Sequence, residues 1–355
     1  MRFISLFPQS LWVLPLLAAN ACAPAKPSPT VVAAKSEKKP IDLRTAVVGF
    51  YNLENLFDTQ DDPQTSDDDL TPASYKQWDE ARYRTKLSNL ASVIKELGAA
   101  DGPDVLGVIE LENKQVLKAL VAEPAIADRN YQIVHFDSPD PRGIDVALLY
   151  KPEHFSVTTQ RAVRITLPDT TMGTRDLLVV DGVLNGEPIT LMVCHWPSRR
   201  GGQKALNRRL SVAQQTRRVI GEQLKANPHA RILLMGDFND APTDSSIVHL
   251  LGASPDLPKL PKGKLYNAFY DLQIQGKGTM YYRSRPDVFD MMLLSPGLTT
   301  GGGLHFKPSS AAIYAPDRLT SPQSKFPGEP LGTYIGRKYI GGYSDHFPVY
   351  LTLTK

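Results

Sequence analysis

The stretch Ile232-Leu233-Leu234-Met235-Gly236-Asp237-Phe238-Asn239-Asp240-Ala241-Pro242 decides the fold class of this chain. Its apolar half is long enough for a buried β-strand, and a glycine followed by an acid and an amide marks the end of that strand. Because side chains alternate along an extended segment, Asp237 and Asn239 are expected on one side and Phe238 on the other. An isolated Gly-Asp-x-Asn is more typical of a strand followed by an Asx turn, so its meaning depends on the rest of the chain.

Polar side chains also stand at or beside the ends of other predicted strands. These strands are apolar runs at 46–53, 104–110, 131–136, 144–150, 189–195, 287–294 and 347–353. Helices are predicted at 79–97, from Asn113 onward and at 245–251, because apolar residues recur there at helical spacing. Strands buried on both faces and alternating with helices predict an α/β sandwich. The polar residues would gather at its rim; they are Asn52, Glu110, His195, Asp237, Asn239, Asp290, Asp345 and His346.

The amino terminus has the features of an export signal. Arg2 precedes a short, interrupted apolar segment, which predicts a signal peptide over residues 1–21. Residues 22–42 are rich in Pro, Ala, Ser and Lys and predict a disordered linker, or a lipoprotein tether to the membrane if Cys22 is acylated. One domain is expected from 43 to 355. We therefore expect an exported protein: periplasmic, extracellular or an outer-membrane lipoprotein.

Composition adds little about the partner. The chain has 355 residues and a net charge of +3, which is too small to indicate nucleic-acid binding by itself. The segment 196–218 is basic and contains no acid, which is typical of either a nucleic-acid patch or a solvated helix face. Arg199 and Arg200 of this segment are the candidate substrate-binding residues.

Short motifs occur in one order between residues 46 and 354. They are Phe50-Tyr51-Asn52, Pro103-Asp104 through Glu110, Gly143-Ile144-Asp145-Val146-Ala147, His195-Trp196-Pro197-Ser198, Gly236-Asp237-Phe238-Asn239, Phe289-Asp290 and Ser344-Asp345-His346-Phe347-Pro348. As an ordered set they resemble the endonuclease/exonuclease/phosphatase superfamily, to which deoxyribonuclease I and bacterial sphingomyelinase belong. The resemblance implies a deoxyribonuclease I-like four-layer sandwich of two mixed β-sheets flanked by helices, with the site at one edge.

Phosphodiester hydrolysis needs a divalent cation, a base that activates water, donors for the developing charge and an acid for the leaving oxygen. Oxygen ligands favour Mg²⁺, or Mn²⁺ in its place, over zinc. Glu110 is the best candidate ligand, with Asn52 and Asp345 nearby. Ca²⁺ is a candidate structural ion for the acidic loop 58–72, although the loop lacks EF-hand spacing and fits a solvated loop better.

The resemblance implies roles for the remaining residues. Asp237 would orient or deprotonate the attacking water, and Asn239 would donate to the phosphate. Asp290 would pair with His346 and raise its pKa. The sequence leaves open whether Asp237 or His346 is the base.

His195 would protonate the leaving oxygen, and Asp145 would orient it. The alternative is that His195 ends a strand and Asp145 binds backbone amides. Arg175 would contact a phosphate by its place in the pattern, although an arginine that starts a strand is commonly part of an exposed ion pair.

These residues predict an exported, metal-dependent phosphodiesterase, with DNA, or RNA, as the favoured substrate of an endonuclease. The alternative is a lipid or small-molecule phosphodiesterase or phosphatase, like sphingomyelinase or an inositol phosphatase, that uses the same site. A binding protein without activity is disfavoured because no expected catalytic position is missing. The sequence implies no obligate protein partner.

Overall fold

The computed structural model describes residues 41–169, 173–257, 260–299, 302–322 and 327–355. The predicted signal peptide and the linker or tether as far as residue 40, with Cys22, lie outside the described residues. Among the described helices, none has the length and apolar character needed to cross a membrane.

The first β-sheet has seven strands in the order β14-β18-β1-β2-β4-β3, with β15 also paired to β18. β1 runs parallel to β2 and antiparallel to β18, and β2 runs antiparallel to β4. The strands are β1 (Thr45–Leu56), β2 (Val105–Leu111), β3 (Gln132–His135), β4 (Asp145–Tyr150), β14 (His305–Phe306), β15 (Ala312–Ile313) and β18 (Val349–Thr354).

The second sheet has seven strands in the order β5-β6-β7-β8-β13-β10-β9. They are β5 (Phe155–Val163), β6 (Leu177–Leu184), β7 (Glu187–His195), β8 (Ile232–Asp237), β9 (Ala253–Ser254), β10 (Leu265–Asn267) and β13 (Asp290–Leu294). Asn185 and Gly186 join β6 to β7 with φ of 49° and 85°, the positive values that a tight hairpin turn requires. Two small hairpins, β11 (Met280–Tyr282) with β12 (Arg285–Asp287) and β16 (Tyr334–Ile335) with β17 (Lys338–Tyr339), lie outside both sheets.

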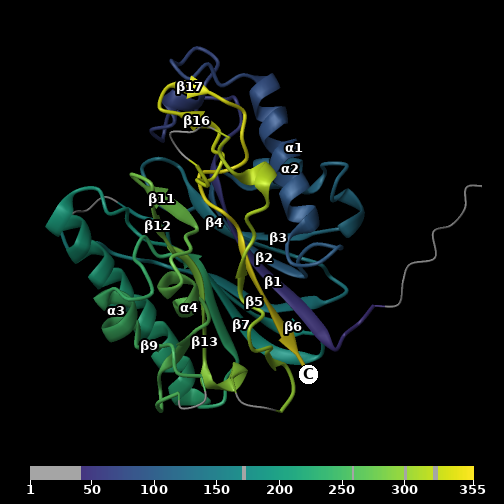
Figure 1. Cartoon of the computed structure of the whole chain (residues 1–355), viewed down its shortest axis with the longest axis vertical. Helices are drawn as coiled ribbons and strands as arrows, with labels where there is room; N and C mark the ends of the chain where they lie inside the picture. The colour runs from purple at the N-terminus through teal and green to yellow at the C-terminus, as the bar shows by residue number, and fades with distance from the viewer. Residues whose placement is uncertain (1–40, 170–172, 258–259, 300–301, 323–326) are drawn as a thin grey trace, which may run out of the picture. The chain divides into compact units, whose positions relative to one another are not determined.

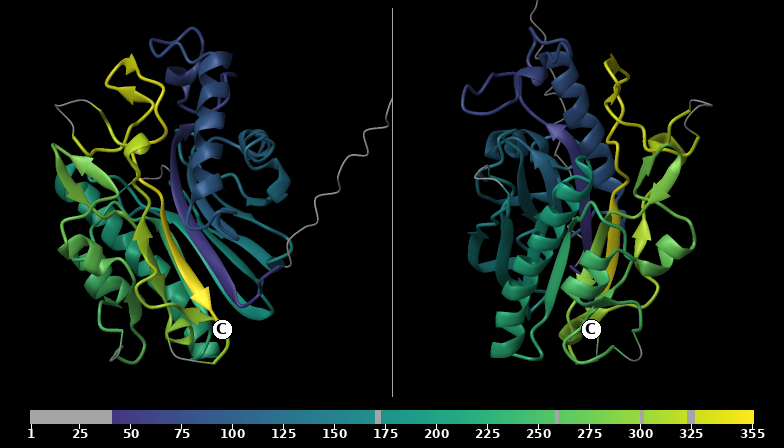
Figure 2. Two further views of the ribbon diagram at one scale, coloured as in Figure 1. Left: turned by 45° about the vertical axis from the view of Figure 1, so that its right-hand side comes forward. Right: turned by 90° about the vertical axis from the view of Figure 1, so that its left-hand side faces the viewer.

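Helices cover the outer faces of the two sheets (Figures 1 and 2). They are α1 (Glu80–Glu96), α2 (Lys114–Val121), α3 (Gly202–Ala226) and α4 (Tyr270–Ile274); short 3₁₀ helices lie at Asp68–Leu70, Ala127–Arg129, Pro296–Leu298 and Asp317–Leu319, and a π-helical turn at Ser246–Leu251. α1 and α2 pack on the first sheet in one buried cluster. The cluster between the sheets continues under α3. The predicted four-layer sandwich is therefore confirmed.

β2 shows how the sequence produces these layers. Val105 and Ile109 pack against the second sheet, whereas Leu106 and Val108 pack against the helices. Both faces are buried, so the strand is apolar at almost every position rather than at alternate ones. Gly107 leaves room for the Met235 side chain of the second sheet, which a Cβ at residue 107 would meet.

The strand directions bring the predicted polar residues to one edge. β1 and β2 are parallel, so they end at the same edge, and the antiparallel β18 begins there. In the second sheet β7 and β8 end together, and the antiparallel β13 begins beside them. The two sheets thus present strand ends, with their loop residues, to a common place.

Candidate active site

One rung of the second sheet carries three buried polar residues. His195 ends β7, Asp237 ends β8 and Asp290 begins β13; the register pairs His195 with Asp237, and Asp237 with Asp290. The His195 Nε2 atom lies 3.8 Å from Asp237 Oδ2. Because neighbouring strands are only about 4.8 Å apart, a single rung is enough to make these groups converge.

His346 joins this rung from the first sheet, from the segment just before β18. Its Nδ1 atom lies 2.7 Å from Asp290 Oδ2. Burial alone would lower the pKa of His346, but the charge and hydrogen bond of Asp290 raise it well above its ordinary value. Since Nδ1 faces Asp290, Nε2 is the ring nitrogen left for other contacts.

The Gly-Asp-x-Asn stretch forms an Asx turn that holds the Asp237 carboxylate. The backbone N–H of Asn239 donates to Asp237 Oδ1 at 2.8 Å, and Asn239 adopts a left-handed φ of 49°. Phe238 points away into the core, where its ring meets Trp196 edge to face. Burial raises the pKa of Asp237 to about 7. The sequence left two alternatives for this stretch, an Asx turn or polar side chains that converge on one site. The structure contains both.

Glu110 connects the two sheets at this edge. The β2–β4 register shifts between Ile109 and Leu111, and Glu110 has a φ of 57°, so its side chain leaves the regular pleat. Its Oε1 accepts a hydrogen bond from Asn52 Nδ2 at 3.2 Å and lies 3.7 Å from His195 Nε2. Backbone strain at a polar strand end is typical of functional sites.

Asp345 stands next to this pair. The hydroxyl of Ser344 donates to the Asn52 carbonyl oxygen at 2.7 Å, which ties the last loop to the end of β1. Asp345 is exposed at the surface, yet desolvation of its carboxyl by packed atoms, and then the charges of Glu54 and Glu110, raise its pKa to about 7.

The donor set fits a hard divalent cation. Three carboxylates crowd the site, those of Glu110, Asp237 and Asp345, and a bound cation would relieve their mutual repulsion. The described site offers oxygen ligands and no thiolate, which suits a hard cation. Asp237, Asp290 and His346 also offer three ligand atoms within 4.8 Å of one another. The Asn52 amide oxygen already accepts from the backbone N–H of Glu54 at 2.8 Å, so Asn52 also positions its neighbours.

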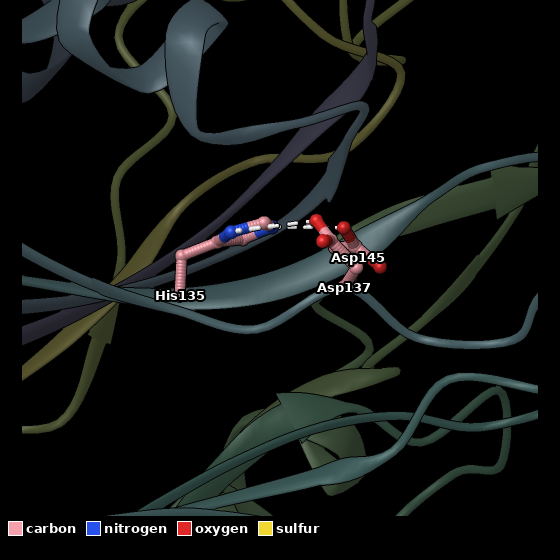
Figure 3. Close-up of side chains that lie close together, drawn as sticks. All are labelled: His135, Asp137 and Asp145. Atoms are coloured by element: carbon pink, nitrogen blue, oxygen red, sulfur yellow. Dashed lines mark hydrogen bonds and ion pairs between the residues drawn. The ribbon is translucent and has the colours of Figure 1, made fainter. Parts of the chain in front are cut away.

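Asp145 does not contact His195, so the predicted pairing is wrong. Its Oδ2 lies 2.8 Å from His135 Nε2 (Figure 3). Its Oδ1 accepts from the backbone N–H and the hydroxyl of Ser138. The reason is the alternation of β4: Val146 packs between the sheets, which turns Asp145 to the outer face. His195 Nδ1 is left without a hydrogen-bond partner among the residues that the structure describes.

Arg175 is buried, which contradicts the alternative of an exposed ion pair. Its guanidinium donates to Asp140 Oδ2 at 2.8 Å and to the Trp196 carbonyl oxygen at 2.6 Å. That carbonyl oxygen also accepts from Asn239 Nδ2 at 3.0 Å. Burial, and then the charge of Arg175, lower the pKa of His195 well below its ordinary value.

The two other predicted substrate-binding arginines differ. Arg199 is held by Asp244 Oδ2 at 2.5 Å and by the Asn239 carbonyl oxygen at 3.0 Å, and its guanidinium covers the Phe289 ring. Arg200 is exposed, and its side chain has no hydrogen bond or ion pair within the described part of the chain. Arg200 is therefore freer than Arg199 to contact an anion.

Sequence reasoning missed Lys86, which is buried beneath the site. Its Nζ donates to Glu54 Oε2 at 3.2 Å, to Thr333 Oγ1 at 2.7 Å and to the Tyr343 carbonyl oxygen at 2.8 Å. Lys86 ties α1 to β1 and to the loop before Asp345. A signal was present, because a lysine between Tyr83 and Leu90 falls on the apolar face of the helix.

We expect Lys86→Met to lower the free energy of unfolding by about 3 kcal/mol, because it leaves the Glu54 carboxylate nearly buried without its cation. Urea denaturation of the purified protein measures this change. Lys95→Met, on the exposed face of the same helix, is the matched control and should change it by less than about 0.5 kcal/mol. Equal stabilities of the two variants would refute a structural role for Lys86.

Comparisons with known proteins agree with this architecture. A model of the endonuclease/exonuclease/phosphatase family matches residues 47–355. Humanized TDP2 of D. rerio with 14 mutations is similar at a TM-score of 0.54 and 18% identity, covering 88% of this chain and 100% of that chain. The catalytic domain of human Nocturnin with a bound sulfate anion is similar at a TM-score of 0.52 and 17% identity, covering 88% of this chain and 94% of that chain.

A mannosyl-6-phosphatase of Bacteroides thetaiotaomicron is similar at a TM-score of 0.53 and 17% identity, covering 87% of this chain and 100% of that chain. At such identities the likeness shows a common fold alone. No curated protein matches the chain.

Proposed function

Since the chain belongs to the endonuclease/exonuclease/phosphatase family, whose members are divalent-metal-dependent phosphoesterases, we propose that it is an exported Mg²⁺-dependent endonuclease. Its substrate would be DNA, or RNA, hydrolysed by in-line attack of water. The observation that carries the proposal is the convergence of His195, Asp237 and Asp290 on one rung, with Glu110 facing them from the other sheet.

Glu110, Asn52 and Asp345 would hold the Mg²⁺, with Mn²⁺ as a substitute; the ion supplies positive charge to the non-bridging oxygens of the phosphate. The crowding of carboxylates at the site supports this assignment of the metal ligands. Asn52 also fixes the Glu110 carboxylate through its amide.

The chain's own groups would perform the proton transfers. Asp237, held by the turn at Asn239, would orient the attacking water, and either Asp237 or His346 would take its proton. Asp290 would keep His346 in one tautomer through Nδ1. The second N–H of the Asn239 amide would donate to the phosphate. All of these groups lie at the same edge, so they can act on one bound phosphate.

His195 would protonate the leaving oxygen from its imidazolium form, whose Nε2 lies 3.7 Å from Glu110 Oε1 and 3.8 Å from Asp237 Oδ2. Burial disfavours that form, so this role requires the neighbouring carboxylates to stabilise it. His195→Ala should lower the rate with an ordinary diester about a hundredfold or more, which is typical of general acid catalysis. The loss should be far smaller with a p-nitrophenyl diester, because nitrophenolate leaves without a proton.

Steady-state rates on the two substrates test this role. Asp145→Asn is the control, because it breaks the contact with His135 and not one with His195, and its effect on both substrates should be equal. An equal loss on both substrates in His195→Ala would show that His195 is not the acid.

Metal-supplemented hydrolysis of a panel tests the substrate class. The panel holds plasmid DNA, RNA, sphingomyelin and inositol phosphates. We expect plasmid nicking and conversion to linear DNA. If sphingomyelin or an inositol phosphate is cleaved while the plasmid stays intact, the protein is a lipid or small-molecule phosphodiesterase or phosphatase and not a nuclease.

Export is a separate part of the proposal and rests on residues 1–21 and the composition of 22–42. Mass spectrometry of the mature protein from its native host should find an amino terminus near residue 22, with or without an acylated Cys22 as a membrane tether. A mature protein that retains Met1 would contradict export.

A further inference from the structure

A pocket of about 290 Å³ lies next to the candidate active site and is strongly basic. Its charged lining residues are Asp140, Arg142, Arg175, Arg200 and Arg208, four cations against one anion. The formal excess is three positive charges. The uncharged part of the lining includes Pro197 and Ser198, which follow His195 and Trp196 in the chain.

Contacts from outside the lining, within the described residues, neutralise one of these positive charges. Arg208 is paired with Asp169 at 2.8 Å and 3.0 Å. Arg175 and Arg142 share the single carboxylate of Asp140, at 2.8 Å and 3.4 Å. Arg200 is exposed without a side-chain partner in the described chain. After these pairings the pocket still has more positive than negative charge.

Arg175 is the lining residue of the pocket that is most firmly held by its contacts. It is 7% exposed, and its Nε atom has no hydrogen-bond partner among the described residues. A buried guanidinium with an unused donor is costly unless something compensates for it. This Nε atom is inaccessible, so an anion in the pocket would be held by the positive charge of Arg175, which lines the pocket, and not by this donor.

The backbone adds to this environment. α3 begins at Gly202 after Gly201, whose φ is 109°, and no side chain caps its first turn. The first N–H groups of a helix lack intrahelical partners and lie at the positive end of its dipole, which favours an anion. Arg200 immediately precedes this helix, and Ala205 of its first turns lines the pocket.

The pocket is joined to the active site through one peptide. The Trp196 carbonyl oxygen accepts from Arg175 on the pocket side and from Asn239 on the active-site side. We propose that this pocket binds a second phosphate group of the substrate, adjacent to the phosphate that is cleaved. The inference rests on the proposed function, and it makes the preferred substrate a phosphoester that carries a neighbouring phosphate.

The second phosphate could come from a nucleic-acid backbone or from a small bisphosphate. Calorimetry with matched ligands distinguishes them: thymidine 3′,5′-bisphosphate against thymidine 5′-phosphate, and fructose 1,6-bisphosphate against fructose 6-phosphate. Asp237→Asn protein in Mg²⁺ is used, so that binding is measured without turnover. The result is then independent of whether the protein cleaves any diester.

We expect one bisphosphate to bind about tenfold more tightly than its monophosphate, as one charge-assisted contact implies. Adding Arg200→Gln or Arg142→Gln should remove that preference. Adding Arg84→Gln, which deletes the same charge on exposed α1, should retain it. Absence of any preference in both pairs, or a preference that survives both pocket variants, would overturn the proposal.

Discussion

Asp237→Asn is expected to lower the rate of phosphodiester hydrolysis by about a thousandfold or more, with the fold intact. The carboxylate lies at the centre of the site, 3.8 Å from His195 Nε2 and opposite Asp290 in the register. An amide has nearly the same shape and can still accept from the backbone N–H of Asn239. It cannot take a proton from water, and it removes one negative charge from the site.

Steady-state kinetics and thermal unfolding of the same preparation measure this. Asp240→Asn is the matched control: the same substitution in a buried acid whose partners are Ser246, Arg209 and, at 3.5 Å, Arg199. Asp240→Asn should lower the thermal stability and leave the rate of hydrolysis within a few-fold of the wild-type rate. A rate for Asp237→Asn above one tenth of the wild-type rate would exclude Asp237 from the chemistry.

Glu110→Gln should raise the Mg²⁺ concentration needed for half-maximal rate about a hundredfold or more. Glu110 is the carboxylate that the β2 irregularity and a left-handed φ turn into the site. A neutral amide is a much poorer ligand for a hard cation than a carboxylate. The Asn52 amide would then also lose its charged acceptor.

Mg²⁺ titrations of the rate compare this variant with Glu112→Gln. The Glu112 carboxylate lies two residues further on and accepts instead from the backbone N–H of Asp58, so its loss should not alter the Mg²⁺ dependence. Equal Mg²⁺ dependence of Glu110→Gln and the wild type would remove Glu110 from the metal site.

Strand-end patterns predicted the fold and most of the assembled site. An apolar run followed by Asp237, or ending at Glu110 or His195, is a local feature that survives in the structure because the strands carrying it are buried on both faces. The edge strand β5 was missed for the opposite reason: its middle, Thr158 to Arg161, is polar and mainly exposed, so no apolar run marks it.

Pairing between distant segments is where the sequence was insufficient. Nothing local indicates that Asp145 faces His135 on the neighbouring strand rather than His195 in the other sheet. The basic segment after His195 contains no acid, yet Arg199 is held by Asp244, which only the fold brings near. Lys86 likewise finds Thr333 across most of the chain. Such partners depend on tertiary contacts that residue spacing does not encode.

Metal dependence is tested by the rate of plasmid hydrolysis by the wild-type protein in excess chelator, before and after Mg²⁺ is restored. We expect no hydrolysis in chelator and full recovery with Mg²⁺ or Mn²⁺, because the crowded carboxylates of the site would repel a phosphate unless a cation is bound. Undiminished hydrolysis in excess chelator would contradict metal dependence.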